Sequence, residues 1–295
     1  MGRLKLACAQ MSCMPANIAG NLDKHLRFIM EARSKAVDLL VFPELSLTDY
    51  LSAPDLGSLK RSIDSTEMAA VANAAESMAV SFGFIEAGED GSSYNAQALV
   101  SNGTVIHVHR KLNLPTYGNL REGFFYSAGN RVDLAQVDTT RAATLICADS
   151  YNPALTWLAA LQGADLLLHP IASARSAVGG DFDNPASWET NLRYIAMIYG
   201  LPIVMTNHCG TRGALDFWGG SRILDANGRE LARAGEGEVL IDATIETGDT
   251  MLARQLLPTV RDSAPQLVAT ELGRVLGHLK KSDHLVCREL CPPAT

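Results

Sequence analysis

Short apolar runs alternate along this chain with longer segments in which apolar residues recur at helical spacing. Apolar runs of four to eight residues between turn residues are typical of strands, and apolar positions three and four residues apart are typical of helices. We expect strands at residues 4–10, 37–42, 80–86, 94–100, 104–110, 142–147, 165–169 and 202–207, and a β-rich stretch over residues 218–224, 230–234 and 238–243. The strongly apolar segment 37–42 is typical of a strand that is buried on both faces.

Helices are expected in the intervals between these strands. The pattern predicts helices at residues 66–78, 153–162 and 185–199. An earlier helix carries Leu22, Leu26, Ile29 and Ala36 along one side, and Asn21 can cap its first turn. Because helices and strands interleave throughout, the pattern favours one α/β domain over two.

A tight turn is predicted between the strands at 94–100 and 104–110. Asn102-Gly103 is typical of a two-residue hairpin loop, because both residues tolerate a positive φ. Thr104 completes a glycosylation sequon with them, and we interpret these residues as the turn rather than as a modification site.

The last 50 residues differ from the rest of the chain in their pattern of apolar residues. Residues 266–281 carry an apolar stripe at helical spacing, and a tail containing cysteine and proline follows. The stripe consists of Leu267, Val268, Leu272, Val275, Leu276 and Leu279. We therefore expect one domain over residues 1–250 and a C-terminal extension over 251–295. The stripe either packs on a partner subunit or folds back on its own domain, as amphipathic helices usually do.

Composition and charge narrow the class of protein. With 295 residues, 47% hydrophobic and 19% charged, the chain has the size and apolar content of one large α/β domain with a sizeable core. A net charge of −7 argues against non-specific nucleic-acid binding, which needs a basic surface. The apolar run after Lys5 is too short for a secretory signal, and no stretch of about 18 apolar residues predicts a membrane helix. We expect a cytoplasmic protein without membrane contacts.

The cysteines and histidines do not predict a metal site. Six cysteines are scattered along the chain without a Cys-x-x-Cys pair or zinc-ligand spacing, so we expect reduced thiols. They are Cys8, Cys13, Cys147, Cys209, Cys287 and Cys291. His107 and His109 would share one face of a strand, but no clustered carboxylates accompany them, which disfavours a metal-dependent amidohydrolase. Since a glycine-rich phosphate loop is also missing, we expect no cofactor.

Three reactive residues each follow an apolar strand. Glu44 comes after Leu-Leu-Val-Phe-Pro, Lys111 after the strand at 104–110, and Cys147 after Ala-Thr-Leu-Ile. Functional groups often stand where a strand opens into a loop in α/β proteins. Taken singly, Glu44 and Lys111 also fit exposed loop residues, and Cys147 fits a buried inert thiol.

Together the three residues fit covalent catalysis. A partly dehydrated carboxylate suits general acid/base work, and a cation stabilises an oxyanion or a thiolate. A cysteine becomes a nucleophile when a base and a positive partner favour its thiolate. No histidine shares a recognisable papain-like signature with Cys147. The expected set is therefore Cys–Glu–Lys rather than Cys–His.

Three sequence blocks carry a family resemblance. They are Val-Phe-Pro-Glu-Leu-Ser-Leu-Thr (41–48), Arg-Lys-Leu-Asn-Leu-Pro (110–115) and Leu-Ile-Cys-Ala-Asp (145–149). In their order and spacing they resemble the signature blocks of the nitrilase superfamily, the carbon–nitrogen hydrolases. The resemblance extends from about residue 4 to 243.

The resemblance implies a fold and a mechanism. The fold is a four-layer α-β-β-α sandwich in a single α/β domain. The activity is hydrolysis of a non-peptide C–N bond of a small amide through a cysteine thioester, in a homo-oligomer. Glu44 is implied as the general base, Lys111 as the transition-state stabiliser and Cys147 as the nucleophile. Glu122 is implied as a substrate-positioning residue, and the N–H of Ala148 as a donor to the oxyanion.

The sequence also departs from the family pattern. Asp49 stands where glycine is usual, Asn113 stands where histidine is common, and residues 195–199 lack the family's usual motif. Cys147-Ala148-Asp149 is similar to amidase branches, whereas nitrilase branches commonly show Cys-Trp-Glu. Asp149 either shapes the pocket or is a buried hydrogen-bonding residue, since buried carboxylates are usually paired.

Other functions remain open at the level of sequence. A nitrilase, an N-carbamoyl hydrolase or an acyltransferase could use the same three residues. A catalytically inactive binding or scaffold protein on this fold is the alternative from another class. Retention of all four polar positions, Glu44, Lys111, Glu122 and Cys147, favours an enzyme.

Overall fold

The computed structural model describes residues 2–50 and 56–281, with no side-chain detail for residues 279–281. Cys287 and Cys291 therefore lie outside the described residues, as does the side chain of Leu279. The chain divides into a compact unit, Met1–Leu257, and a second unit, Pro258–Thr295.

Two six-stranded sheets form the centre of the first unit. The first has the order β14-β1-β2-β3-β4-β5 and the second the order β13-β12-β9-β8-β7-β6. The strands of the first sheet are β1 (Arg3–Gln10), β2 (Leu39–Val41), β3 (Ala79–Ala87), β4 (Ser93–Ser101), β5 (Thr104–Arg110) and β14 (Val239–Glu246). Those of the second are β6 (Leu134–Val137), β7 (Thr140–Thr144), β8 (Leu166–Pro170), β9 (Ile203–Thr206), β12 (Arg222–Leu224) and β13 (Glu230–Arg233). A separate hairpin joins β10 (Cys209–Arg212) to β11 (Leu215–Trp218).

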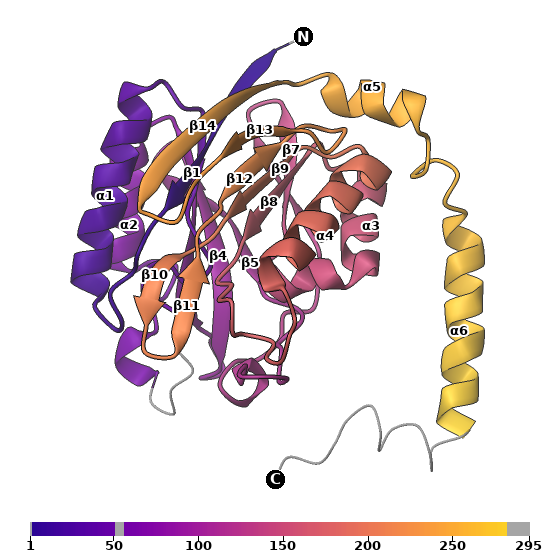
Figure 1. Cartoon of the computed structure of the whole chain (residues 1–295), viewed down its shortest axis with the longest axis horizontal. Coiled ribbons are helices and arrows are strands. Elements are labelled where there is room, and N and C mark those ends of the chain that lie inside the picture. Colours follow the sequence, from indigo (N-terminus) through magenta and orange to yellow (C-terminus); the bar gives the residue numbers. More distant parts are fainter. Residues whose placement is uncertain (1, 51–55, 282–295) are drawn as a thin grey trace. The chain divides into compact units, whose positions relative to one another are not determined.

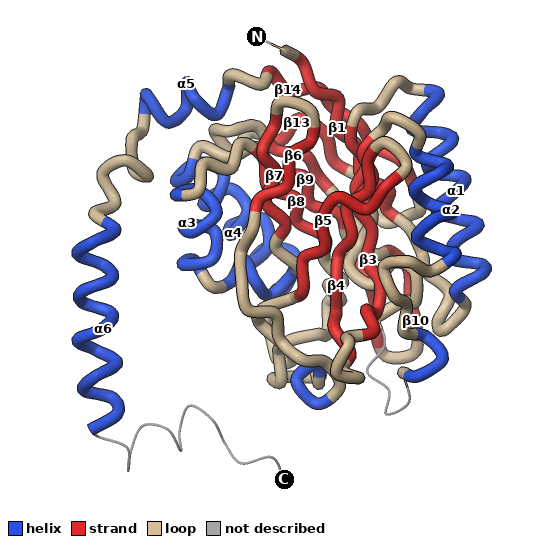
Figure 2. Tube along the Cα trace, turned by 180° about the vertical axis from the view of Figure 1, so that it is seen from behind, coloured by secondary structure: helices blue, strands red, loops and turns tan. Residues whose placement is uncertain are grey.

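Helices cover the outer face of each sheet. Helices α1 (Ile18–Ser34) and α2 (Thr66–Ala75) lie on one side of the paired sheets, and α3 (Pro153–Leu161) and α4 (Asn184–Tyr199) lie on the other (Figure 1). The view from behind shows the same layers with the strands between the two pairs of helices (Figure 2). This arrangement is the four-layer α-β-β-α sandwich that the family resemblance implied, and the expectation is confirmed.

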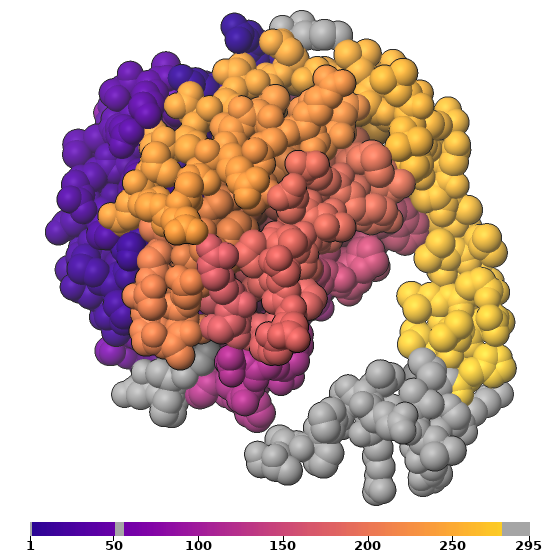
Figure 3. Space-filling model, viewed as in Figure 1, coloured from indigo at the N-terminus to yellow at the C-terminus, as the bar shows by residue number. Residues whose placement is uncertain are grey.

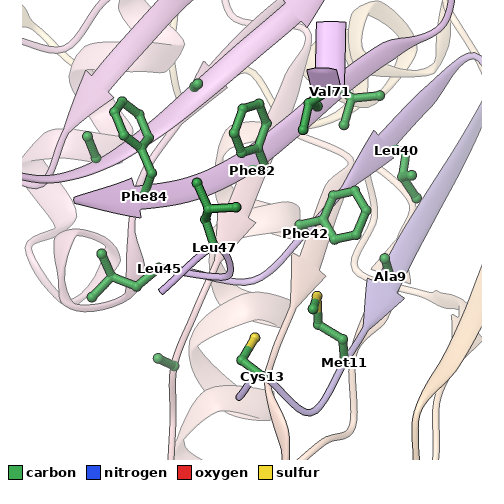
Figure 4. Packing of buried hydrophobic residues seen from close by; sticks show 14 of the residues in the cluster. Ala9, Met11, Cys13, Leu40, Phe42, Leu45, Leu47, Val71, Phe82 and Phe84 are labelled. Carbon is green, nitrogen blue, oxygen red and sulfur yellow. The ribbon is translucent and has the colours of Figure 1, made fainter. Parts of the chain in front are cut away.

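Side chains from one strand point alternately into two hydrophobic cores, one on each face of the sheet. Leu39 and Val41 of β2 pack between the sheets, whereas Leu40 and Phe42 pack beneath the helices. Successive side chains of a strand point to opposite faces, so a strand covered on both faces must be apolar at every position. Figure 4 shows Phe42 beside Phe82 of β3 in the core beneath the helices. Each such fully buried side chain contributes roughly 1.5–3 kcal/mol.

Parallel strands occupy the middle of each sheet. β1, β2 and β3 are parallel, and so are β7, β8 and β9. Antiparallel β14 then closes the far edge of the first sheet against β1, so the first and last strands of this unit are neighbours. Their colours, indigo and orange, meet on the face seen in Figure 3. The loops after the parallel strands open at one end of each sheet, where several of the strand-end residues gather.

Most predicted elements are present with small shifts of their ends. The Asn102-Gly103 turn joins β4 to β5, and both residues have a positive φ, 50° and 75°. The strand expected at 142–147 is wrong at its end, because β7 stops at Thr144 and a 3-10 helix, η3 (Cys147–Tyr151), begins at the cysteine. Strand β6, the β10–β11 hairpin and helix α5 (Asp249–Leu256), all of them short, were not predicted from the sequence.

Asn21 does not cap a helix, so that prediction was wrong. The cap of α1 is Asn17, whose side chain accepts from the N–H of Gly20 at 3.0 Å. Asn21 is instead fully buried inside the helix and donates to the carbonyl oxygens of Met14 and Leu47. Its amide therefore ties the start of α1 to the loop that follows β2.

The second unit contains helix α6 (Pro265–Lys281), close to the helix expected at residues 266–281. The described members of its apolar stripe are all exposed: Leu267, Val268, Leu272, Val275 and Leu276. No helix in the described part of the chain is long and apolar enough to cross a membrane.

Candidate active site

Glu44 lies in the tight loop that follows β2. Its neighbour Leu45 has a φ of 51°, and the loop backbone passes directly over Gly83 of β3. A Cβ atom at Gly83 would lie 2.1 Å from the Leu45 nitrogen, so only glycine fits there. The close approach leaves the Glu44 side chain completely buried.

Lys111 follows β5 and meets two carboxylates. Its Nζ lies 2.6 Å from Oε1 of Glu44 and 2.7 Å from Oε1 of Glu122. Glu122 begins the 3-10 helix η2 (Glu122–Phe124), and its Oε1 also accepts from the hydroxyl of Tyr50 at 2.8 Å. Residues from three distant loops thus share one buried network.

The charges in this network shift the pKa values of its members. Burial by itself lowers the pKa of Lys111, but Glu122 and Glu44 outweigh burial and raise it well above its ordinary value. Lys111 is therefore a permanent cation. Burial raises the pKa of Glu122 to about 7, although Lys111 opposes the shift.

Cys147 stands at the first position of η3 with a φ of 47°. A left-handed conformation is strained for a residue with a side chain, and such strain is common at functional positions. Burial raises the pKa of the Cys147 thiol well above its ordinary value, and the charge of Glu44 raises it further, while Lys111 lowers it. The resting thiol is therefore protonated, and an attack by its sulfur requires a base.

Cys147 differs from the other described cysteines in exposure. It is partly exposed, whereas Cys8, Cys13 and Cys209 are buried, and all four are unpaired. Burial raises the pKa values of these three thiols too. Cys147 is therefore the accessible thiol among the described cysteines.

Asp149 is a structural hydrogen-bonding residue. Its fully buried carboxylate accepts from the N–H groups of Ile146, Leu112 and Asn113 at 3.0, 2.9 and 2.7 Å. The ring of His109 contacts the same carboxylate at 3.1 Å. Asp149 therefore fixes the Cys147 turn to the segment that carries Lys111, and the alternative that it shapes the pocket is wrong.

Two further contacts hold the Glu44 side chain. Asn95 Nδ2 donates to Oε1 at 2.7 Å, and the N–H of Ala172 donates to Oε2 at 2.7 Å. Neither group was predicted from the sequence. Asn95 had a recognisable signal, because it is a polar residue inside an apolar strand, but the Ala172 main chain had none.

The main chain of Glu44 is held by a buried histidine. His208 Nε2 lies 2.6 Å from the Glu44 carbonyl oxygen, and Arg212 contacts His208 Nδ1 at 3.0 Å. Burial lowers the pKa of His208 to about 3, so the imidazole is neutral. Arg212 Nε also pairs with Asp49 Oδ2 at 2.8 Å. This set of Asp49, Arg212 and His208, here called the Asp–Arg–His network, was also missed.

Asp49 adopts the backbone conformation that favours glycine, with a φ of 69°. Burial raises the pKa of its carboxyl to about 6, although Arg212 opposes the shift. The residue that departs from the family pattern is therefore the one that pairs with Arg212.

Cys13, Asp49 and His208 form a three-residue group whose ligand atoms lie within 4.8 Å of one another. Arg212 already supplies positive charge to Asp49 and His208. A metal ion would have to displace this guanidinium, so the chemistry of the group fits an ion pair better than a metal centre. His109 is likewise engaged by Asp149.

A narrow cavity of about 20 Å³, which opens to solvent, adjoins Cys147. Its lining is largely aromatic and aliphatic, and it includes Glu122 and Ala148 from the predicted site. The other lining residues are Tyr50, Pro115, Tyr117, Leu120, Tyr151, Ala172, Ser173, Ala177, Val178, Asn184 and Trp188. A shallower groove of about 420 Å³ shares Pro115, Tyr117, Ala148 and Tyr151 with it. Of the predicted site residues, Cys147, Ala148 and Glu122 line this cavity, and the buried Lys111 and Glu44 are connected to it through the contact between Lys111 and Glu122.

Comparisons with known proteins agree with this geometry. The family model for carbon–nitrogen hydrolases matches residues 5–255. A hydrolase in the pqqF 5' region of Pseudomonas protegens is 30% identical, over 90% of this chain and 90% of its own. The glutamine-dependent NAD(+) synthetase of Thermotoga maritima is 29% identical over 92% of this chain, which spans only 46% of that protein. A solved carbon–nitrogen hydrolase from Helicobacter pylori has the same fold, with a TM-score of 0.83, 22% identity and coverage of 92% and 99% of the two chains.

Proposed function

This chain belongs to the carbon–nitrogen hydrolase family, whose members act on C–N bonds, and from that premise we propose that it hydrolyses small amides through a thioester on Cys147. The observation that carries the proposal is the position of Lys111 between two buried carboxylates at 2.6 and 2.7 Å. Cys147 and Glu122 line the same cavity. A thiol and a glutamate on one cavity, with a cation and a base connected to that glutamate, form a complete set for acyl transfer.

The first half of the proposed reaction forms the thioester. Glu44 takes the proton from Cys147 as the sulfur attacks the amide carbon. The developing oxyanion accepts hydrogen bonds from Lys111 and from the N–H of Ala148. Lys111 has three N–H groups, of which two donate to the glutamates, so one remains for the substrate. Glu44 then gives its proton to the departing nitrogen, and ammonia or an amine leaves.

The second half of the reaction consumes water. Glu44 removes a proton from the water that attacks the thioester carbon, and the same two donors stabilise the second oxyanion. The C–S bond breaks, the thiol regains its proton from Glu44, and the carboxylic acid leaves. Covalent catalysis thereby divides one difficult hydrolysis into two easier steps.

Glu122 has a positioning role in this proposal. Its Oε1 holds Lys111 and accepts from Tyr50, while its buried Oε2 has no hydrogen-bond partner among the residues that the structure describes. Because Glu122 also lines the cavity, this free oxygen can accept from the amide nitrogen of a bound substrate. The expected result is an amide oriented with its carbonyl oxygen toward Lys111.

The direct test is to trap the acyl-enzyme. Wild-type protein mixed with a small amide and quenched in acid should carry the acyl mass on the peptide that contains Cys147. Cys147→Ala should show neither adduct nor turnover while keeping a wild-type circular dichroism spectrum. Cys209→Ala, at a buried thiol outside the cavity, is the matched control and should retain both.

Two reagents separate this mechanism from metal chemistry. Iodoacetamide should abolish turnover by alkylating Cys147, and extensive treatment with EDTA should leave turnover unchanged. Full activity in Cys147→Ala, or loss with EDTA and recovery with zinc, would contradict the proposal.

A further inference from the structure

The charge of the cavity beside Cys147 limits the acyl groups that it can accept. None of the fourteen described residues that line it is lysine or arginine. The adjoining groove, lined by residues 112–117, 148, 151 and 152, has no basic residue either among those described. A substrate carboxylate would therefore find no cation from these walls.

The nearest basic groups are already engaged. Lys111 donates two N–H groups to Glu44 and Glu122, and the proposed reaction uses its third N–H for the carbonyl oxygen of the amide. Arg121 follows a lining residue in the sequence, but it is exposed and donates to the carbonyl oxygens of Gly118 and Leu120. Arg175, two residues after a lining residue, pairs with Asp216 and Glu236. Neither arginine lines the cavity.

The polar groups of the inner wall are also largely committed. Ser173 Oγ accepts from Asn184 Nδ2 at 2.8 Å and from Trp188 Nε1 at 2.9 Å. Asn184 Nδ2 donates in addition to the Ala174 carbonyl oxygen at 2.7 Å. These donors are therefore occupied within the protein.

The remaining wall is apolar and partly aromatic. The rings of Tyr151 and Trp188 stack with centroids 4.5 Å apart, and Leu120, Ala177 and Val178 complete the surface. Two glutamates and one lysine lie behind this wall, so the net charge of this end of the site is zero or negative. Such a site repels a carboxylate and does not replace the hydrogen bonds that the carboxylate loses to water. Burial of a hydrocarbon chain at the same wall makes the binding free energy more favourable.

We infer that the substrates are amides of small, uncharged acyl groups, aliphatic or aromatic, and that ω-carboxylated amides are excluded. This inference rests on the proposed function, since it names the substrate class of the same site.

The test compares two amides that differ only in charge. Pentanamide and glutaramate have acyl chains of the same length, ending in a methyl group and in a carboxylate. We expect kcat/KM for pentanamide to exceed that for glutaramate by about 100-fold or more, since an unpaired charge is costly to bury. Equal or faster turnover of glutaramate by the wild-type protein would overturn the inference.

A designed cation should reverse part of this preference. Val178→Arg places a guanidinium at the cavity wall, and Val178→Met is the matched variant that adds bulk without charge. The ratio of kcat/KM for glutaramate to that for pentanamide should rise at least about 10-fold in Val178→Arg relative to Val178→Met. The same ratio in both variants would count against exclusion by charge.

Binding separates this inference from the catalytic proposal. Cys147→Ala can be titrated calorimetrically with each compound, whether or not the wild-type protein turns them over. Binding of pentanamide without binding of glutaramate supports the inference even if the catalytic roles are wrong. Tight binding of glutaramate, or binding of neither compound, overturns it.

Discussion

The imidazole of His208 donates from Nε2 to the backbone carbonyl oxygen of Glu44 over 2.6 Å. A carbonyl oxygen can only accept, so the proton resides on Nε2, and Nδ1 accepts from Arg212 at 3.0 Å. The two residues are 164 positions apart in the sequence. The proposed general base is therefore held through its main chain by a segment of the second half of the domain.

His208→Ala is expected to lower kcat by about 10–100-fold with little change in KM, because a displaced base is misaligned even when the substrate still binds. Steady-state kinetics on matched amounts of folded protein measure the split. His208→Gln, whose amide can still donate, should recover part of the loss. A rise in KM with unchanged kcat would contradict the positioning role.

Arg212→Leu is expected to destabilise the protein by about 3–5 kcal/mol, because it leaves the buried carboxylate of Asp49 without its cation. The double variant Asp49→Gly/Arg212→Leu should recover much of this loss, since glycine removes the charge and also relieves the positive φ of 69°. Urea unfolding of the wild type, both single variants and the double variant measures the coupling. Additive losses would show that the two side chains do not interact.

Glu122 gives stability a pH dependence with a defined sign. Its folded pKa of about 7 exceeds the ordinary value of 4.5, so the folded state binds more protons between these values. Its contribution to stability therefore falls as the pH rises from about 4.5 to about 7 and is level above that. Glu122→Gln removes this dependence. Urea unfolding at pH 5 and pH 8 should show the wild type losing more stability than Glu122→Gln, and parallel losses would be inconsistent with a raised pKa.

Amides should be hydrolysed better than nitriles. An amide requires a proton at its departing nitrogen, which Glu44 can deliver, whereas a nitrile must pass through a thioimidate and take up two waters. Cys147-Ala148-Asp149 also resembles amidase branches of the superfamily. The measurement is kcat/KM for pentanamide against pentanenitrile and for further pairs with a shared acyl group. A nitrile preference across several pairs would overturn the amidase assignment but not the role of Cys147.

We propose that the protein is a homo-oligomer, a dimer or larger. The family resemblance motivates this, together with the exposed stripe of α6, which includes Leu272 and Leu276. Light scattering at micromolar concentration should give at least twice the mass of the 295-residue chain. Leu272→Glu/Leu276→Glu should lower that mass if the stripe forms the interface. A monomeric wild-type protein would refute the proposal.

Sequence alone determined the elements and the position of each reactive residue along them. Burial is visible in the local sequence, because apolar residues alternate with period two in strands and recur every 3.6 residues in helices. This pattern predicted β1, β5, α3 and α4 nearly to their ends, and it placed Glu44, Lys111 and Cys147 just after strands. The signature blocks then supplied the family, and with it the layered fold.

The tertiary structure decided which groups meet. The contacts Asn95–Glu44 and His208–Glu44 join residues 51 and 164 positions apart, and Ala172 reaches Glu44 through its main chain. These pairings depend on strand order and on the path of the loops, which no local period specifies. The same reason explains the error at Asn21 and the two readings left open for Asp149, because the sequence does not distinguish a polar side chain that caps a helix or lines a pocket from one that is buried and hydrogen-bonded.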